Sequence, residues 1–523
     1  MVTKPLECPP NIVWIMPDDC DFRRLGCYGG QALTPAIDRI AAEGIRCEQM
    51  YCSSSTCTPS RYAYLTGQYA GRCSDPQYLE ENPLTDVYKV AWNPIINETT
   101  FTISKGLSDY RGYRTGIAGK WHAGRSRDRL NLPALDPDAD PDNPAVDKIL
   151  HRYQEALSAE VKRTGGFDYA ASIVWGDIES FPVKRLRQHN LEWITKGALD
   201  FLSVHDERPF FLHVAPTAIH GPSHEQSYQT DIRYTQGGLR EDLVGLHPPR
   251  ARMRERLASQ GLPYDHHTVG VTWIDDLVAA ILDKLDALGQ SMNTLIIFSV
   301  DHNTEPGKGT CHHKGVHIPL IMRWPAVIEP GRVCRAQMQN VDLAPTLFDA
   351  TGITPPEGVQ PDSVSWLPLL TGETDIVHED LFFEFGYARA VQAGRWRYIA
   401  LRYPQHLLHA MESGALNEAP NHINDRLQNQ MCIAIEAYPA YFDPDQLFDI
   451  ENDPDEQHNL AGDPAYAGVL ANMKQRLQRY LETFEHPYDL DVPAFMRSER
   501  YQALCEATRK IGTGHIGWWK KRS

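Results

Sequence analysis

Short apolar runs that alternate with amphipathic helical segments constrain the fold of this chain more than any other feature. The runs at 11–16, 210–214 and 294–300 are mostly apolar, as buried strands are. Between the last two, residues 271–288 repeat apolar side chains at helical spacing and stop before Gly289, a typical helix C-cap. Strands that alternate with such helices form largely parallel sheets covered on both faces. The sequence therefore predicts an α/β fold whose site lies at the carboxyl ends of its strands.

The character of the sequence changes near residue 378. The elements predicted after this point are three strands and a helix, at 380–385, 395–401, 447–450 and 466–484. A chain of 523 residues is also too long for one compact core. We therefore expect a catalytic α/β domain at 1–377 and a smaller α+β domain with an antiparallel sheet at 378–523. The Pro- and Asp-rich residues 131–150 predict a surface loop in the first domain.

Composition limits the partners of the chain. Its net charge of −17 argues against nucleic acid, because phosphate binding requires a basic face. We find no stretch of 18 apolar residues and no apolar segment of a signal peptide at the start, so we expect no membrane span and no export. The eleven cysteines include no C-x-x-C pair, which favours a reduced, cytoplasmic protein over a disulfide framework. An anionic substrate would need a locally positive site inside this acidic protein.

Acidic residues follow two of the predicted strands. Asp18 and Asp19 come directly after the first strand, and Asp301 and His302 end the strand at 294–300. Either pair alone is compatible with an ordinary polar turn. Together, at the carboxyl ends of strands in one sheet, they can converge on one cation, which would relieve the repulsion between adjacent carboxylates. Three carboxylates favour Ca²⁺, and the histidine leaves Mn²⁺ or Mg²⁺ open.

The pentapeptide C-T-P-S-R at residues 57–61 places a cysteine at the start of a predicted helix. Pro59 presets the backbone there, and the hydroxyls around it favour a helix cap. A helix N-terminus together with Arg61 forms an anion site, so a group at Cys57 would face a bound oxyanion. The alternative is an ordinary capped helix with a buried cysteine, and other residues must decide between the two.

Four further residues have the chemistry of an anion site. Lys120 and His122 alternate on extended backbone after a short strand, so they share one side of the chain. A lysine holds sulfate or phosphate oxygens, and a histidine moves protons near neutral pH. His220 follows the strand at 210–214, and Lys308 lies in a Gly-rich loop. A pair of ordinary surface residues is the alternative for Lys120 and His122.

Six segments together resemble the type I sulfatase family in order and spacing. They are the Asp-Asp at 18–19, C-T-P-S-R at 57–61, G-K-W-H at 119–122, H-G-P at 220–222, S-V-D-H at 299–302 and G-K-G-T at 307–310. The resemblance covers nearly the whole chain and implies an alkaline-phosphatase-like domain followed by a small C-terminal domain. It also implies that Cys57 is oxidised to formylglycine, whose hydrate is the nucleophile. The metal ligands that it implies are Asp18, Asp19, Cys57, Asp301 and His302, and the residues around the sulfate are Arg61, Lys120, His122, His220 and Lys308.

Two departures from the family pattern affect the substrate. Many relatives have Asn where this chain has His302, and the histidine also occurs in phosphonate monoester hydrolases, so a phosphorus ester stays open as substrate. After the Lys308 loop, residues 311–315 read C-H-H-K-G in place of the usual Y-E-G-G run. The substrate contacts that we expect are Trp175, His312, His313 and Lys314. The alternative for the 311–315 segment is a loop that happens to be basic.

We therefore expect a sulfatase that hydrolyses the sulfate ester of a carbohydrate or another small alcohol, with Ca²⁺ favoured as its metal. Its expected partners are the sulfated substrate and a formylglycine-generating maturation enzyme, and a homo-oligomer stays open. The alternatives are a phosphonate monoester or phosphodiester hydrolase of the same superfamily and a catalytically silent binding protein.

Overall fold

The computed structural model describes residues 9–304, 306–356, 359, 362–421 and 429–519. Its main feature is a nine-stranded sheet in which neighbouring strands run parallel except at β9, which is antiparallel to both β2 and β8. The order across the sheet is β10 (Arg332–Cys334), β2 (Ile45–Tyr51), β9 (His317–Arg323), β8 (Thr294–Ser299), β1 (Asn11–Ile15), β5 (Phe210–Ala215), β3 (Arg114–Lys120) and β4 (Tyr169–Val174), with β11 (Met338–Gln339) beside β2.

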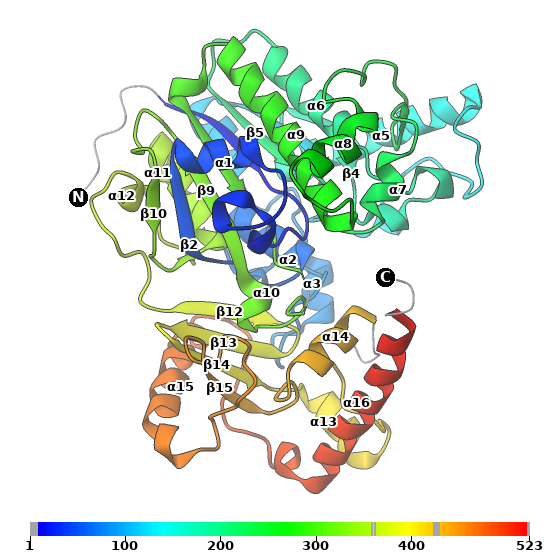
Figure 1. The fold of residues 1–523 in the computed structure, drawn as a ribbon. Coiled ribbons are helices and arrows are strands. Elements are labelled where there is room, and N and C mark those ends of the chain that lie inside the picture. Colours follow the sequence, from blue (N-terminus) through cyan, green and yellow to red (C-terminus); the bar gives the residue numbers. More distant parts are fainter. Residues whose placement is uncertain (1–8, 305, 357–358, 360–361, 422–428, 520–523) are drawn as a thin grey trace.

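Helices cover this sheet (Figure 1). Strands β3, β5 and β8 are buried along their whole length, as expected where helices pack on both faces. The helices of this part are α1 (Pro35–Ala42), α2 (Cys57–Thr66), α3 (Pro76–Glu81), α4 (Ile103–Arg111), α5 (Pro144–Gly165), α6 (Leu191–Ser203), α7 (His224–Tyr228), α8 (Met253–Ser259), α9 (His266–Ala287), α10 (His313–Val316), α11 (Leu343–Thr351) and α12 (Leu367–Leu370). One group of helices contains α6, α9 and α1: α6 packs on β3, β4 and β5 and contacts α9, and α9 contacts α1. A second group contains α11, which contacts α2 and α4.

A second, four-stranded antiparallel sheet follows, drawn in yellow to orange below the first in Figure 1. Its strands, in spatial order, are β12 (Leu381–Phe385), β13 (Ala388–Ala393), β14 (Trp396–Leu401) and β15 (Asp445–Asp449). The helices of this part are α13 (Gln405–Ser413), α14 (Asn429–Ala437), α15 (Ala467–Leu481) and α16 (Glu499–Trp519). Helix α15 packs on β13 and β14.

The predicted fold class is confirmed: a mixed but mostly parallel sheet with helices, then a smaller antiparallel sheet. Gly289, the expected helix stop, has a left-handed φ of 67° two residues after α9 ends. The predicted end of the loop at 131–150 is wrong, because helix α5 already begins at Pro144, with Asn143 as its N-cap. The domain boundary at 377/378 stays a prediction. Among the described helices, none is long and apolar enough to cross a bilayer.

Candidate active site

The carboxyl ends of β1 and β8 bring two pairs of side chains together. Asp18 and Asp19 follow β1, and Asp301 and His302 follow β8, its parallel neighbour. The backbone N–H of Asp19 donates to Oδ1 of Asp301 at 3.2 Å, so the two segments are joined directly. Asp19 has a left-handed φ of 61°, which a short acidic residue tolerates better than most. The two pairs predicted from the sequence therefore lie at one edge of the sheet.

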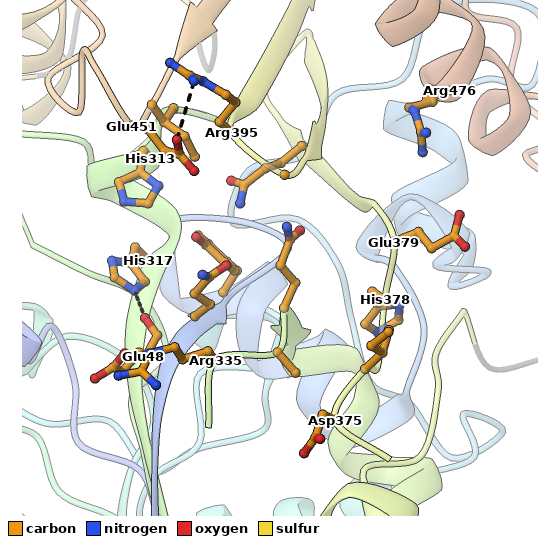
Figure 2. A pocket seen from close by; sticks show the side chains of 18 residues that line it. Glu48, His313, His317, Arg335, Asp375, His378, Glu379, Arg395, Glu451 and Arg476 are labelled. Carbon is orange, nitrogen blue, oxygen red and sulfur yellow. Dashed lines mark hydrogen bonds and ion pairs between the residues drawn. The ribbon is translucent and has the colours of Figure 1, made fainter. Parts of the chain in front are cut away.

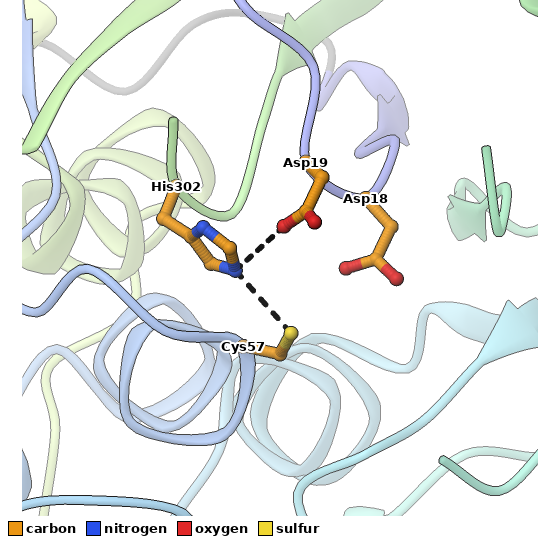
Figure 3. A group of neighbouring side chains, drawn as sticks. All are labelled: Asp18, Asp19, Cys57 and His302. Carbon is orange, nitrogen blue, oxygen red and sulfur yellow. Dashed lines mark hydrogen bonds and ion pairs between the residues drawn. The ribbon is translucent and has the colours of Figure 1, made fainter. Parts of the chain in front are cut away.

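Four of the five predicted metal ligands direct donor atoms into one small volume (Figure 3). Asp18, Asp19, Cys57 and His302 each offer one atom, and these atoms all lie within 4.8 Å of one another. His302 Nε2 is 3.1 Å from Asp19 Oδ1 and 3.3 Å from Cys57 Sγ. All four residues are buried, and buried carboxylates are stable only beside cations. This donor set fits a hard divalent cation, with the imidazole as an additional ligand.

Asp301, the fifth predicted ligand, faces Arg61. The guanidinium Nη2 and Nε of Arg61 donate to Oδ2 of Asp301 at 2.9 and 3.2 Å. The same oxygen is 3.9 Å from His302 Nε2. Burial raises the pKa of the Asp301 carboxyl, and the nearby charge of Asp18 acts in the same direction. Asp301 thus lies at the margin of the group, and its coordination of a metal stays a prediction.

Cys57 is the first residue of α2, a helix whose ten residues are all buried. Thr56 precedes it in extended conformation as the N-cap, so the free N–H groups of the first turn surround residue 57. Burial raises the pKa of the Cys57 thiol well above its usual value, and the charge of Asp18 raises it further. A thiol that keeps its proton is a poor nucleophile, because the thiolate is the reactive form. The unmodified thiol of Cys57 is therefore poorly suited to act as a thiolate nucleophile.

Three buried cations, Arg61 and two lysines, neutralise the carboxylates. Lys120 donates to Asp18, and its Nζ is 3.7 Å from Cys57 Sγ. Lys308 Nζ donates to both carboxylate oxygens of Asp19, at 2.7 and 2.9 Å.

These ion pairs set the charge states of the carboxylates. Burial acts to raise the pKa of Asp18, but the charges of Lys120 and Arg61 act against it, and the pKa stays well below its usual range. Burial is outweighed in the same way at Asp19, whose pKa is lowered chiefly by Lys308. Both carboxylates are therefore ionised at neutral pH.

Two histidines lie on the more open side of the site. His122 and His220 have side chains that are 21% and 12% exposed, whereas Lys120 is 1% exposed. Burial lowers the pKa of His122 to about 3, and the charge of Lys120 contributes to this shift. His122 is therefore neutral at physiological pH and able to accept a proton.

Sequence reasoning missed Asp177, which joins these groups. Its Oδ1 accepts a hydrogen bond from Lys120 Nζ at 2.9 Å and lies 3.6 Å from His220 Nε2 and 3.9 Å from His122 Nδ1. Asp177 comes shortly after the carboxyl end of β4, as Asp18 does after β1. The same rule would have found Asp177 had the strand at 169–174 been recognised.

The predicted substrate contacts lie outside this group of side chains. Trp175 is buried; its Nε1 donates to Arg125 O at 3.0 Å, and its own carbonyl accepts the N–H of His122 at 3.1 Å. His312 is fully buried and stacks on Tyr438 with ring centroids 3.8 Å apart. Lys314 pairs with Asp455 at 2.5 Å. The basic loop thus packs against the C-terminal part of the chain, and its role in substrate binding stays a prediction.

His313 lines a separate cleft of about 760 Å³ (Figure 2). This cleft opens between β2, the segment 335–337 that follows β10, and the turns of the C-terminal sheet around Arg395 and Glu451. The backbone N–H of His313 donates to Glu456 at 2.8 Å, and its ring lies beside that of His317 with centroids 4.8 Å apart.

The sheet order, the helices and the small antiparallel sheet place the protein in the alkaline-phosphatase-like fold class. Within that class the chain belongs to the sulfatase family, the sulfuric ester hydrolases. The family model described as "Sulfatase" matches residues 10–353, more than half of the chain. A second model, described as "N-sulphoglucosamine sulphohydrolase, C-terminal", matches residues 307–413.

Curated relatives agree with this assignment, and solved structures share the fold. Arylsulfatase A of Homo sapiens is 28% identical over 507 residues, which cover 90% of this chain and 87% of the relative. Steryl-sulfatase of Rattus norvegicus is 27% identical, with 91% and 89% covered. A structure described as "BT4656 in complex with its substrate D-Glucosamine-2-N, 6-O-disulfate" has a TM-score of 0.59 at 18% identity and 91% and 98% coverage. The phosphonate monoester hydrolase of Agrobacterium radiobacter has a TM-score of 0.55 at 16% identity and 90% and 95% coverage. Because the identity of these two solved structures is low, their similarity to this chain is one of fold alone.

Proposed function

We propose that the protein removes sulfate from an ester of a carbohydrate or another small alcohol, with a formylglycine hydrate made from Cys57 as nucleophile. The observation that carries this proposal is the position of Cys57. It begins a fully buried helix, its Sγ lies between His302 and Lys120, and its thiol stays protonated. As a formylglycine hydrate, residue 57 would supply an oxygen nucleophile in place of the thiol.

Asp18, Asp19 and His302, with Asp301 at the margin, are the residues that would hold a divalent metal. Ca²⁺ is favoured by the carboxylates, and Mn²⁺ or Mg²⁺ stays open because of the histidine. When bound, the metal supplies Lewis acidity toward the nucleophile and the sulfuryl oxygens.

The cations of the site would hold the sulfate group. Arg61, Lys120 and Lys308 are buried and fixed by ion pairs before any substrate binds. Charges that are already oriented stabilise a transition state without reorganisation, and this is usually the largest catalytic contribution. We expect these three side chains to compensate the charge that develops on the sulfuryl oxygens.

The two histidines would move protons. His220 lies on the open side, where the alcohol leaves, and we propose that it protonates the departing oxygen, with Lys308 as a second donor. His122 is neutral, so it can take a proton from residue 57 when sulfate is released.

The second candidate is a phosphonate monoester or phosphodiester hydrolase. It is favoured by His302, which stands in the metal group where many sulfatases have Asn. Turnover of an aryl sulfate and of the matching aryl phosphonate by one preparation separates the two activities, because each ester releases the same phenol.

The test requires the protein to be produced together with a formylglycine-generating enzyme, in a cytoplasmic setting as we propose for the native protein. The peptide that contains residue 57 should lose about 18 Da relative to cysteine, whereas thiol oxidation adds mass. The modified, metal-loaded protein should then hydrolyse members of a panel of sulfated monosaccharides and aryl sulfates. If the modified protein hydrolyses neither sulfates nor phosphonates, the result favours the third alternative, a catalytically silent binding protein.

A further inference from the structure

One carboxylate oxygen of Asp177 meets three side chains of the site. Its Oδ1 is 2.9 Å from Lys120 Nζ, 3.6 Å from His220 Nε2 and 3.9 Å from His122 Nδ1. These three side chains come from different segments: the end of β3, the loop after β3 and the loop after β5. Asp177 is therefore the point where they meet on the open side of the site.

Backbone hydrogen bonds fix Asp177 relative to Lys120 and His122. The N–H groups of Trp121 and His122 donate to the carbonyls of Val174 and Trp175 at 2.9 and 3.1 Å. These bonds continue the β3–β4 pairing beyond the strands, so the segment of Asp177 runs beside that of His122. The paired backbone ends at Trp175, two residues before Asp177, and Asp177 then begins a short turn in which its carbonyl accepts the N–H of Ser180 at 3.0 Å.

Asp177 differs from the other acids of the site in its exposure. Its side chain is 39% exposed, whereas that of Asp18 is 1% exposed. It also shares Lys120 with Asp18, so the ammonium is held from two sides, with Cys57 Sγ 3.7 Å away. A lysine is a flexible point charge, and a second partner restricts the positions that it can occupy. Without Asp177, Lys120 would be free to turn fully toward Asp18.

We propose that Asp177 is a positioning residue for sulfate ester hydrolysis, which aims Lys120 at the sulfuryl group and holds His220 and His122 toward the leaving and attacking oxygens. This inference rests on the proposed function. A displacement of catalytic groups by about 1 Å is enough to reduce rates about 100-fold. Two simpler roles compete with it: a surface ion pair, and a ligand of a second metal, since Asp177 also lies within two small groups of potential ligands.

The experiment compares Asp177→Asn and Asp177→Glu with wild-type protein, all with formylglycine at residue 57 and metal bound. Glu179→Gln is the matched control, because Glu179 lies in the same segment, is 49% exposed and comes within 3.9 Å of His220 Nδ1. The substrates are aryl sulfates whose phenols differ in acidity. kcat, KM, metal content and the thermal midpoint are measured for each protein.

We expect Asp177→Asn to lower kcat about 10- to 100-fold with KM changed less than about threefold, and most for the least acidic phenols, which depend most on proton delivery. Asp177→Glu should recover part of the loss, Glu179→Gln should stay within about threefold of wild type, and metal content should not change.

Several results would overturn the inference. An Asp177→Asn variant with wild-type kcat would leave a mere ion pair, and a loss of kcat that is equal for all phenols would overturn the proposed hold on His220. A parallel loss in Glu179→Gln would indicate general surface charge, and a loss of bound metal would indicate a ligand. If wild-type protein hydrolyses no sulfate ester, the proposed function and the inference fail together; if it does and Asp177→Asn equals it, the inference alone fails.

Discussion

At the residue scale, the site is organised by three matched ion pairs. Arg61 pairs with Asp301, Lys120 with Asp18 and Lys308 with Asp19, so the charges of these six side chains cancel, and Asp177 beside Lys120 adds one negative charge. A divalent cation added to this set makes the site positive. An anionic ester is then attracted into a protein whose overall charge is −17.

Replacement of Cys57 by serine tests the nucleophile. A serine hydroxyl has no second hydroxyl on the same carbon that could expel the sulfate, so Cys57→Ser should lose sustained turnover by at least about 1,000-fold. Multiple-turnover kinetics with an aryl sulfate measure this loss. Cys27→Ser, at a half-buried cysteine, is the control and should keep wild-type activity. Sustained turnover by the serine variant would contradict a formylglycine mechanism.

Replacement of Arg61 tests the stability of the buried charges. Arg61→Ala leaves Asp301 without its partner in the core, which should destabilise the protein by about 3–5 kcal/mol. The shift of the urea unfolding midpoint measures this effect. Arg39→Ala, which breaks exposed pairs with Glu43 and Asp286, should change stability by less than about 1 kcal/mol. Equal shifts for the two variants would show that burial of the Arg61 pair is irrelevant.

At the scale of elements, the sequence predicted strands where apolar runs are continuous, and with them the acids that follow β1 and β8. It missed β4 because residues 169–174 read Y-A-A-S-I-V, in which two small alanines and a serine weaken the apolar run. Only the second half of this strand is buried in the structure. Because this strand was not predicted, Asp177, which follows it, was not predicted either. The reversed direction of β9 was equally invisible, because a buried strand has the same pattern in either direction.

The basic loop at 311–315 shows a different limit. Histidines and a lysine shortly after the Lys308 loop have the chemistry of a binding site, and the sequence does not reveal their partners. In the structure these partners are Tyr438, Asp455 and Glu456, more than one hundred residues away in the chain. Tertiary contacts with such separation are not encoded in local patterns.

Gly119 near the end of β3 and Gly112, which ends α4 two residues before β3, offer a matched test of how this strand places Lys120. Gly119 has a φ of 110°, and a Cβ there would lie 2.1 Å from the carbonyl oxygen of Ala215 on β5. Gly112 also has positive φ, at 64°, and a Cβ added there would meet no atom of the described residues within 4 Å. Gly112→Ala should therefore lose only about 1 kcal/mol, the strain of a left-handed alanine.

Gly119→Ala should lose more than about 3 kcal/mol, because backbone atoms of two paired strands must separate. Lys120 would move with them, so activity should fall even in the fraction that stays folded. Thermal midpoints and kcat per folded molecule measure the two effects. Similar midpoints for both variants would show that the β3–β5 contact tolerates a side chain.

At the scale of the whole molecule, the C-terminal sheet completes the burial of α2, the helix that begins at Cys57. The N–H of Glu384 on β12 donates to Ser53 O at 3.0 Å, just before α2, and its side chain accepts from Gly71 N at 2.9 Å, just after it. Ala63 on α2 packs in one apolar cluster with Phe382. The small sheet is thus part of what holds residue 57 in place.

Glu456 joins the two parts of the chain through a buried carboxyl group. It accepts the N–H of His313 from the loop after Lys308 and lies 3.6 Å from Arg397 on β14, whose Nη1 donates to Cys311 O at 2.8 Å. Burial raises the pKa of Glu456 to about 7, although Arg397 acts in the opposite direction. The folded protein therefore holds a proton at this position that the unfolded chain releases near pH 4.5.

The sign of the resulting pH dependence follows from that difference. Because the folded state binds the proton more tightly, the stabilisation from Glu456 is complete below about pH 4.5 and is lost as the pH rises through about 7. Between pH 5 and 8 the loss should be about 2–3 kcal/mol. Glu456→Gln removes this titrating group, so its unfolding free energy should not show this loss. As the pH rises from 5 to 8, wild type should therefore lose about 2–3 kcal/mol relative to the variant. Urea unfolding at both pH values measures the difference, with the exposed Glu451→Gln as a control that should show no such shift; an unchanged difference would mean that Glu456 titrates alike in the folded and unfolded chains.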